Sequence, residues 1–492
     1  MISEKNSQIS QSYQNIFQML ENVHYNESSK SESSKLSSKF NASLFSKIDR
    51  SNFRSKDYFV FSITAFTILV SLFLIYYLQH DFEELHLSRS KTIWGQLLLG
   101  LSYLLLIYQI IFIFYIIYKF SKYKAIESVS DSELPTCTVI VPAYNEGKLV
   151  LDTLRSLVAN DYPKEKLQIM AIDDGSKDDT WKWMLEAKKE LGDRIEIFQQ
   201  PKNMGKRHAL YHGFTTGTGD VFVTVDSDSI VKQDTLRNLV SPFVTNKNCG
   251  AVGGNVRVLN KKQGLIPKML NVTFVFSFEF IRSAQSVSGS VLCTPGALAA
   301  YKRSAVLNCL EDWINQTFMG KASDIGEDRA LTNMILKQGL HVLFQKNSFV
   351  YTNSPESYQQ LNKMFIRWER SNVRENIEMT KFAFSNFRKE QKFDARFLLI
   401  NQWIKVILSI PFTLLMFYLI ISNPILFLSS TFFGIFIFST VQVVLYSKRY
   451  NFLESLWFYT YSIFYTFTLF WITPYAILTA GKKGWLTREI NN

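Results

Sequence analysis

Two carboxylates stand at the end of an apolar stretch near the middle of the chain. The segment "DVFVTVDSDS" (220–229) is rich in β-branched residues and ends in Asp226 and Asp228, with one serine between them. Side chains two positions apart in an extended segment point the same way, so both carboxylates can converge on one hard cation. Mg²⁺ and Mn²⁺ take such oxygen ligands and keep positions for substrate phosphates. Acidic turns after strands are common, so this pair alone is a weak signal.

A second pair of acids, Glu327 and Asp328, occurs in "DIGEDRALTNMILKQG". Acids in the first turn of a helix complement its dipole, which is a sufficient structural explanation for them. One of them could instead be a general base that takes a proton from a hydroxyl group. Lys206 and Arg207 in "NMGKRHAL" precede a predicted helix, where they could bind phosphate oxygens or form a solvated basic turn.

The segments that must position these residues alternate between strands and helices from about residue 134 to residue 350. The strand patterns are "TCTVIVPAYNE", "LQIMAIDDGS", "RIEIFQQ" and "DVFVTVDSDS". This alternation predicts an α/β domain, a parallel sheet with helices on both faces. Ligands bind beyond the carboxyl ends of such strands. The polar clusters "YNE", "DDGS" and "DSDS" all stand at strand ends, so we expect a nucleotide site there.

Apolar stretches flank this region on both sides. Residues 58–78 and 93–118 carry no charge and are long enough to cross a bilayer, and further apolar stretches lie near 398–421 and 425–446. The borders are basic, and the chain has a formal net charge of +12. Because positive charge collects on the cytoplasmic side, we expect a cytosolic α/β domain and a short external hairpin between the first two spans. No motif of the known nucleic-acid-binding modules is present, which disfavours a nucleic-acid partner.

The last apolar stretch, 455–479, is rich in aromatic residues and contains Pro474. If it crossed the membrane, the basic segment "GKKGWLTRE" after it would lie outside, against the charge rule. We therefore expect an interfacial or re-entrant helix, with a fifth full span as the alternative.

Taken in order, the motifs VPAYNE, DDGS, GKR, DSD, GED and RW, flanked by apolar spans, resemble the family 2 inverting glycosyltransferases. Within that family the chain is most similar to membrane-embedded processive synthases of the hyaluronan synthase and chitin-oligosaccharide synthase branch, on "GKRHAL", "GEDRALTN", "RWERSNVRE" and "GWLTRE". The resemblance covers roughly residues 55–490. It implies a GT-A-like, Rossmann-like cytosolic domain inserted between transmembrane and interfacial helices, UDP-sugar donors, and Mg²⁺ or Mn²⁺ as the cofactor.

The implied domain order runs along the whole chain. It comprises a disordered Ser/Lys-rich tail (1–55), two transmembrane helices (56–120), a glycosyltransferase domain (121–355), amphipathic interface helices (356–396), two transmembrane helices (397–446), and an interfacial or re-entrant helix with a gating loop (447–492).

The resemblance also assigns roles to single residues. Asp328 would be the catalytic base with Glu327 beside it, and Asp226 and Asp228 would hold the metal and the diphosphate. The uridine would be held by Tyr144, Glu146, Asp173 and Asp174. The nucleotide-sugar and its diphosphate would be contacted by Lys206, Arg207 and Arg367. The acceptor end and a loop that closes over substrate would be formed by Gly296, Trp368, Trp485, Thr487 and Arg488.

Some positions depart from the family pattern. Met364 stands where Q-x-x-R-W has glutamine, Pro295 and Ala297 replace the serine and proline of an acceptor-side stretch, and Leu486 replaces a glycine of the gating segment. The first two departures bear on acceptor recognition, and hence on which polymer is made.

Polar residues also occur on the predicted interfacial and membrane helices. Arg367, Arg370 and Arg374 share one helix face, and we expect the latter two to pair with lipid head groups or with Glu369 and Glu375. Candidates to line a secretion channel are Gln402, Lys405 and Gln442, although Lys405 could simply snorkel to the interface.

The sequence thus predicts a multi-pass plasma-membrane enzyme that polymerises UDP-GlcNAc, together with UDP-GlcA, into a β-linked, hyaluronan-like polysaccharide and secretes it. Its partners would be the donors, the growing polysaccharide and membrane lipids. The alternatives are a chitin-type GlcNAc polymer or oligomer synthase, a non-processive enzyme acting on a lipid carrier, and a transporter or scaffold with a degenerate transferase fold.

Overall fold

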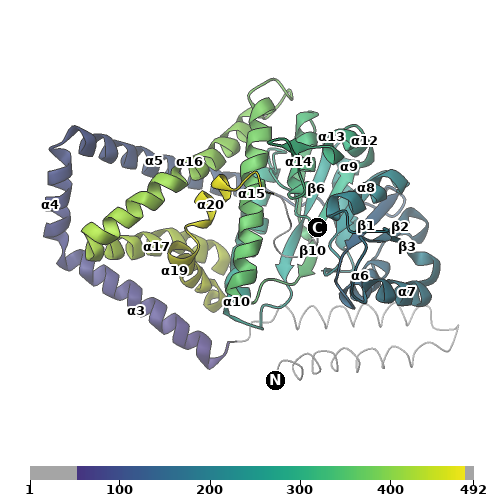
Figure 1. Cartoon of the computed structure of the whole chain (residues 1–492), viewed down its shortest axis with the longest axis horizontal. Helices are drawn as coiled ribbons and strands as arrows, with labels where there is room; N and C mark the ends of the chain where they lie inside the picture. The colour runs from purple at the N-terminus through teal and green to yellow at the C-terminus, as the bar shows by residue number, and fades with distance from the viewer. Residues whose placement is uncertain (1–52, 483–492) are drawn as a thin grey trace. The chain divides into compact units, whose positions relative to one another are not determined.

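The computed structural model describes residues 53–482. Most of the expected tail, and the expected substrate-closing residues Trp485, Thr487 and Arg488, lie outside the described residues. Within the described part, a sheet domain and a group of long apolar helices lie side by side, with the long helix α15 (Tyr358–Ala383) between them (Figure 1).

An eight-stranded sheet in the order β3-β2-β1-β4-β7-β6-β10-β5 forms the centre of the first part. Its first half is parallel and contains the four predicted strands, β1 (Cys137–Ala143), β2 (Leu167–Asp173), β3 (Glu196–Gln199) and β4 (Val221–Val225). The carboxyl ends of these strands carry "YNE", "DDGS" and "DSDS", as the sequence predicts.

The second half of the sheet is mixed, so the expectation of a wholly parallel sheet is wrong there. β7 (Leu298–Lys302) runs antiparallel to both β4 and β6 (Cys249–Val258). β10 (His341–Thr352) is parallel to β6, and the short β5 (Ile230–Val231) is antiparallel to β10. The segment that forms β7 belongs to the stretch aligned with the family's acceptor side, and its pairing depends on strands distant in sequence.

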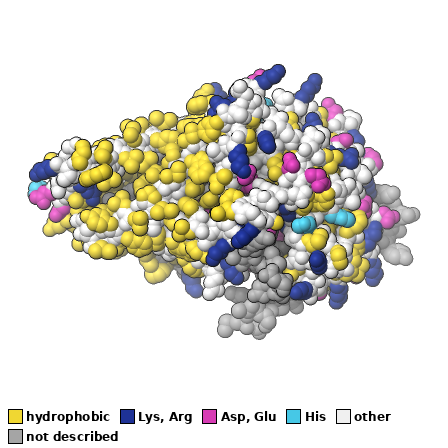
Figure 2. All heavy atoms as spheres, turned by 45° about the horizontal axis from the view of Figure 1, so that its top comes forward, with side chains coloured by type: hydrophobic (Ala, Val, Ile, Leu, Met, Phe, Trp, Pro, Cys, Tyr) yellow, Lys and Arg dark blue, Asp and Glu magenta, His cyan; other side chains and the backbone are white. Residues whose placement is uncertain are grey.

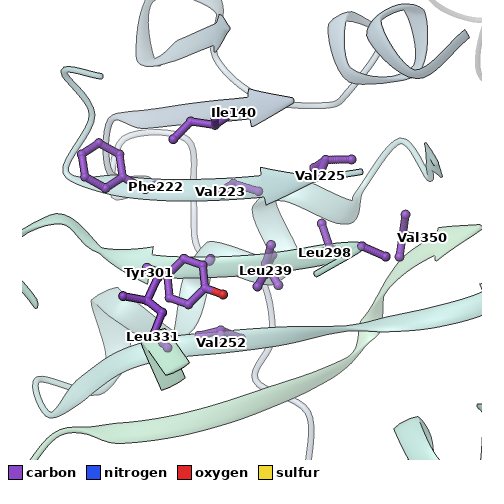
Figure 3. Packing of buried hydrophobic residues seen from close by; sticks show 14 of the residues in the cluster. Ile140, Phe222, Val223, Val225, Leu239, Val252, Leu298, Tyr301, Leu331 and Val350 are labelled. Atoms are coloured by element: carbon purple, nitrogen blue, oxygen red, sulfur yellow. The ribbon is translucent and has the colours of Figure 1, made fainter. Parts of the chain in front are cut away.

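Apolar residues of β1, β4, β6 and β7 form the core beneath the helices (Figure 3). The helices of this domain include α6 (Leu149–Val158), α7 (Thr180–Leu191), α8 (Lys206–Thr216), α9 (Thr235–Thr245) and α14 (Glu327–Lys337). Helix α8 lies close to β1, because an added Cβ at Gly213 would come within 2.4 Å of Ile140 Cγ2. This close packing fixes the start of α8, where Lys206 stands.

Four helices are long and apolar enough to cross a membrane, judged by length and composition. They are α3 (Ser55–Tyr77), α5 (Ile93–Lys122), α16 (Lys392–Ser422) and α17 (Pro424–Ser447), which coincide with the four predicted spans. Their apolar side chains gather at one end of the molecule, while charged side chains gather at the other (Figure 2). The segment between α3 and α5, expected as a loop, forms helix α4 (Gln79–Ser90).

The last apolar stretch is broken, not straight. It forms α18 (Phe452–Ser455), α19 (Trp457–Thr468) and α20 (Ile472–Leu478), and its two main parts are bent by 46° relative to each other. Such a break suits a re-entrant segment and also a broken span, so our preference for the former stays a prediction.

Ionic contacts join the sheet domain to the apolar helices. The helix α10 (Leu265–Phe274) carries Lys268, whose Nζ lies 2.5 Å from Oδ2 of Asp57 on α3. Glu279, in the π-helix Val275–Ile281, binds Arg257 at the end of β6 at 2.6 Å and Arg449 beyond α17 at 3.0 Å. The sheet domain is therefore held to the helices by paired charges, which tolerate little displacement.

We predict that Asp57→Ala destabilises the protein, because Lys268 would keep a buried charge without its partner. The loss should be about 3 kcal/mol, which lowers the apparent Tm in detergent by about 5 °C. Asp81→Ala, which removes an exposed acid on α4, is the matched control and should leave Tm unchanged. If Asp57→Ala and Asp81→Ala had the same Tm, the Asp57–Lys268 contact would not stabilise the protein as described.

Candidate active site

Three elements bring the chemically competent residues together. The turn after β4 carries Asp226 and Asp228, the first turn of α14 carries Glu327 and Asp328, and the first residue of α8 is Lys206. A small cavity lies between these elements, and it is lined by Lys206, Leu210, Phe214, Thr224, Gly296, Tyr301, Trp313, Glu327, Asp328 and Leu331. Glu327 and Asp328 thus line the cavity, and Lys206, which also lines it, connects it to Asp226, about a hundred positions earlier in the sequence.

Lys206 connects the two acid pairs. Its Nζ lies 2.5 Å from Asp226 Oδ1 and 3.3 Å from Glu327 Oε1. Burial disfavours the ammonium charge, but attraction to Asp226 and Glu327 outweighs burial and raises the pKa of Lys206 above its usual value. The lysine is therefore a permanent cation in the site.

Asp228 has weaker compensation than Asp226. Only hydroxyl groups, those of Ser229 and Thr352, donate to its Oδ1, each at 3.3 Å, among the side-chain contacts of the described residues. Burial, together with repulsion from Asp226, raises the pKa of Asp228 to about 6. A divalent cation would relieve this charge, so the pair fits Mg²⁺ or Mn²⁺. No cluster of three or more metal-ligating side chains occurs among residues 53–482, so water and phosphate would supply the other ligands.

Asp328 has the environment of a base. The main-chain N–H groups of Gly296 and Arg329 donate to its two carboxylate oxygens at 3.1 and 2.7 Å, and Cys293 Sγ lies 3.9 Å from Oδ2. Burial, and then repulsion from Glu327, raises the pKa of Asp328. A raised pKa makes the carboxylate a better proton acceptor.

The pKa of its neighbour Glu327 is shifted in the opposite direction, below its usual value. Burial alone would raise the pKa of Glu327, but attraction to Lys206 and Arg367 outweighs it and lowers the pKa. Glu327 therefore stays ionised as the counterion of Lys206, and Trp313 Nε1 fixes this turn by donating to the Glu327 carbonyl at 2.9 Å. Two adjacent acids with pKa values moved in opposite directions indicate a counterion and a base.

Gly296 lets the chain pass between the lysine and the base. A Cβ added at this position would lie 3.0 Å from Lys206 Nζ and 3.5 Å from Asp328 Oδ2. The first of these distances is tighter than an ordinary contact, so any side chain here would displace the lysine. The acceptor role that the resemblance implies for Gly296 stays a prediction, but its place in the site is clear.

Asp173 and Asp174 are both buried, and their expected contact with uridine stays a prediction. The two oxygens of Asp174 accept the N–H groups of Met204 and Gly205 at 2.9 and 2.7 Å, and burial raises its pKa to about 6. Asp173 accepts from Ser176 N and from a glutamine side chain on β3. Asp174 thus holds the loop that leads into Lys206. Tyr144 and Glu146 lie nearby, just beyond the end of β1, and their contact with the base of a nucleotide stays a prediction.

Arg207 is not among the residues that line the cavity, and its expected phosphate contact stays a prediction. Its side chain is buried, and Nη1 donates to the Trp313 carbonyl at 2.6 Å and to Gln316 Oε1 at 3.1 Å. Successive residues of an α-helix are rotated by about 100°, so Lys206 and its neighbour leave the helix in different directions.

Helix α15 approaches the site through its first half. The charge of Arg367 is near enough to favour the ionised forms of both Glu327 and Asp328, although burial and repulsion still leave the pKa of Asp328 raised. Trp368 is half-exposed and packs against Phe274, with 6.1 Å between ring centroids. These positions agree with the expected roles, which stay predictions. Met364, one turn earlier, is buried.

Arg370 and Arg374 are both buried, so their expected pairing with lipid head groups or neighbouring glutamates is wrong. They bind the residues that follow α20 instead, and Arg374 also faces Asp324.

Sequence reasoning missed Asp324, and it missed Trp313 and Thr352. Their roles arise from contacts between distant segments, and no local motif marks them.

Comparisons with known proteins agree with this geometry. Residues 135–371 match the family model described as "Glycosyltransferase like family 2". An N-acetylglucosaminyltransferase of Rhizobium meliloti is 33% identical over 254 residues, which are 51% of this chain and 59% of that protein. A hyaluronan synthase of Streptococcus pyogenes is 31% identical over 252 residues, 50% of this chain and 59% of that protein.

These matches span about three fifths of each relative's length. A longer match is to an N-acetylglucosaminyltransferase of Azorhizobium caulinodans, 28% identical over 76% of this chain and 94% of that protein. Among solved structures, a mannosyltransferase from Pyrobaculum calidifontis, determined with GDP-Man and Mn²⁺, aligns with a TM-score of 0.47 at 19% identity, over 75% of this chain and 92% of that one.

The family model covers the sheet, both acid pairs, Lys206 and the first half of α15, and the mixed sheet is GT-A-like. The predicted family is therefore confirmed: the chain carries the catalytic domain of a family 2 glycosyltransferase.

Proposed function

We propose that the protein is a membrane-embedded inverting glycosyltransferase that uses UDP-GlcNAc, with UDP-GlcA as second donor, to extend and secrete a β-linked, hyaluronan-like polysaccharide. One observation supports the reaction most directly: Asp328, a buried carboxylate of raised pKa, lines the same cavity as Lys206, which is paired with Asp226. A base on one side and a phosphate-binding group on the other are what a single displacement needs.

The step would proceed as follows. Asp328 takes the proton of the acceptor hydroxyl while the hydroxyl oxygen forms a bond to the anomeric carbon. The bond between that carbon and the UDP oxygen breaks, and UDP leaves with the electron pair. Attack from the face opposite to UDP converts an α-linked donor into a β-glycoside, and no covalent enzyme intermediate is required.

The other residues hold the donor and neutralise the leaving group. Lys206 and Arg367 provide positive charge near the diphosphate. Asp226 and Asp228 would hold Mg²⁺ or Mn²⁺, which supplies Lewis-acid neutralisation of the diphosphate when bound. Because Lys206 contacts Asp226 in this structure, donor binding would separate that pair and redirect the ammonium group to a phosphate oxygen.

The four long apolar helices support a membrane placement. With their basic flanks inside, the sheet domain lies in the cytosol, where UDP-sugars are made, and the enzyme is a multi-pass protein of the plasma membrane. Gln402 and Lys405 on α16 and Gln442 on α17 would line the path of the polymer.

A second candidate product is a polymer or oligomer of GlcNAc alone. It is favoured by the Azorhizobium relative, which is named an N-acetylglucosaminyltransferase and is matched over 94% of its length. GlcNAc transfer is common to both candidates, and the second donor separates them.

To test the function, membranes with the protein should be incubated with labelled UDP-GlcNAc, alone and with UDP-GlcA, and the products sized and digested. We expect a long polymer that needs both donors and is cut by hyaluronidase. Membranes with Asp328→Asn should yield about 10²-fold less or none, whereas Asp312→Asn, at an exposed acid on α13 (Leu310–Ile314), should match wild type.

A polymer formed from UDP-GlcNAc alone and cut by chitinase would favour the second candidate. Only single sugars attached to lipid would contradict synthase activity.

Metal removal gives an independent test. We predict that EDTA abolishes transfer, that Mn²⁺ or Mg²⁺ restores it, and that electron paramagnetic resonance detects Mn²⁺ bound in the presence of UDP. Asp228→Asn should weaken Mn²⁺ binding by about tenfold or more, because Mg²⁺-type ions need negatively charged oxygen ligands. Asp193→Asn, at a fully exposed acid, is the control. Unchanged Mn²⁺ binding by the Asp228 variant would remove this carboxylate from the metal site.

A further inference from the structure

We propose that Arg374 is a positioning residue that joins the C-terminal residues Thr479–Lys482 to the loop carrying Glu327 and Asp328. Displacement of the C-terminal residues would then displace the catalytic loop. The proposal rests on the proposed function, because it treats that loop as the one that holds the base.

Arg374 binds the C-terminal residues through their main chain. Its Nε donates to the Ala480 carbonyl at 2.6 Å, and its Nη2 donates to the Lys482 carbonyl at 2.7 Å. The side chain is only 4% exposed, so these acceptors, together with Asp324, compensate a charge that water does not reach. If the Ala480 and Lys482 carbonyls moved away, most of the buried guanidinium would have neither these acceptors nor water as partners. The Arg374 side chain would then tend to move.

The same guanidinium faces the catalytic loop. Its Nη1 lies 3.8 Å from Asp324 Oδ1, three residues before Glu327. Gly326 has φ of +75°, and a Cβ added there would lie 1.9 Å from Ser371 Oγ on α15. The loop is therefore packed directly onto α15 between the two buried arginines, with no room to shift unless the helix contact is broken.

The short hairpin before this loop completes the connection. It consists of β8 (Thr317–Phe318) and β9 (Lys321–Ala322), and the Arg374 guanidinium lies 5.5 Å from the centroid of the Phe318 ring. At its tip, Met319 Sδ would be 3.2 Å from a Cβ on Gly481. The C-terminal residues thus contact the hairpin as well as α15.

Arg370 offers a matched comparison on the same helix face. It is equally buried, and its Nε donates to Thr479 Oγ1 at 3.0 Å, but no contact with Asp324 is recorded for it in the described residues. A change at Arg370 should loosen the C-terminal residues alone, whereas a change at Arg374 should loosen both segments.

Hydrogen–deuterium exchange of the purified full-length protein tests the connection without relying on activity. We expect Arg374→Gln to raise amide exchange about tenfold in both 317–327 and 475–482, and Arg370→Gln to raise it only in 475–482. Exchange in β1 (Cys137–Ala143) reports global stability and should stay at the wild-type level. The proposal would be overturned if amide exchange of 317–327 in Arg374→Gln stayed at the wild-type rate. It would also be overturned if both variants raised exchange of 317–327 equally, or if exchange rose throughout the sheet.

Kinetics then tests the consequence for the reaction. Arg374→Gln and Asp324→Asn should each lower kcat about tenfold, while the KM for the donor stays within about twofold of the wild-type value. If both residues act through the same contact, the double variant should have a kcat no more than about twofold below that of either single variant. Arg374→Lys should recover part of the loss, because it keeps the charge facing Asp324. Multiplicative losses, or a change in KM alone, would overturn the positioning role. If the wild-type protein transfers no sugar, the proposed function fails, while the exchange result still decides the connection.

Discussion

The site depends on the mutual repulsion of carboxylates held out of water. Four of them come from the turn after β4 and the first turn of α14: Asp226 and Asp228 in the former, and Glu327 and Asp328, which line the cavity, in the latter. Without compensation they would take up protons and lose their use as ligands and base. The ammonium group of Lys206 bridges Asp226 and Glu327, so this single cation compensates one acid of each pair, while burial raises the pKa values of the other two, Asp228 and Asp328. Catalysis needs that division, because a base and a metal site must coexist.

Much of the surrounding structure serves to fix that lysine and the turn opposite it. Asp174 binds the loop before Lys206, Gly213 allows α8 to approach the sheet, and Trp313 holds the Glu327 carbonyl. Helix α15 receives the catalytic loop on one side and the residues after α20 on the other. Because ion pairs also join the sheet domain to the apolar helices, the reaction centre has a defined position relative to those helices.

The parts of this arrangement that follow local patterns could be predicted. Apolar strands that end in acids located the two carboxylates after β4, and charge-free stretches located the four long apolar helices. The parts that depend on distant contacts could not. The direction of β7 is set by its neighbours β4 and β6, Arg207 turns inward because Lys206 faces the site, and the buried arginines of α15 find acceptors more than a hundred residues away. Charged residues on a helix resemble a solvated or lipid-facing stripe until their partners are known.

The acid limb of kcat/KM, measured as a function of pH, tests this division of charge most directly. Asp328 must be ionised to act, so activity should fall as pH drops through its raised pKa, above the ordinary range of an aspartate. Burial raises that pKa most, and repulsion from Glu327 adds to it; Glu327→Gln removes only the repulsion, so the limb should move part of the way to lower pH even if kcat is reduced. The account would be contradicted if the acid limb of kcat/KM in Glu327→Gln lay at the same pH as in the wild-type protein. Normal sugar transfer by a variant without the Asp328 carboxylate would contradict it as well.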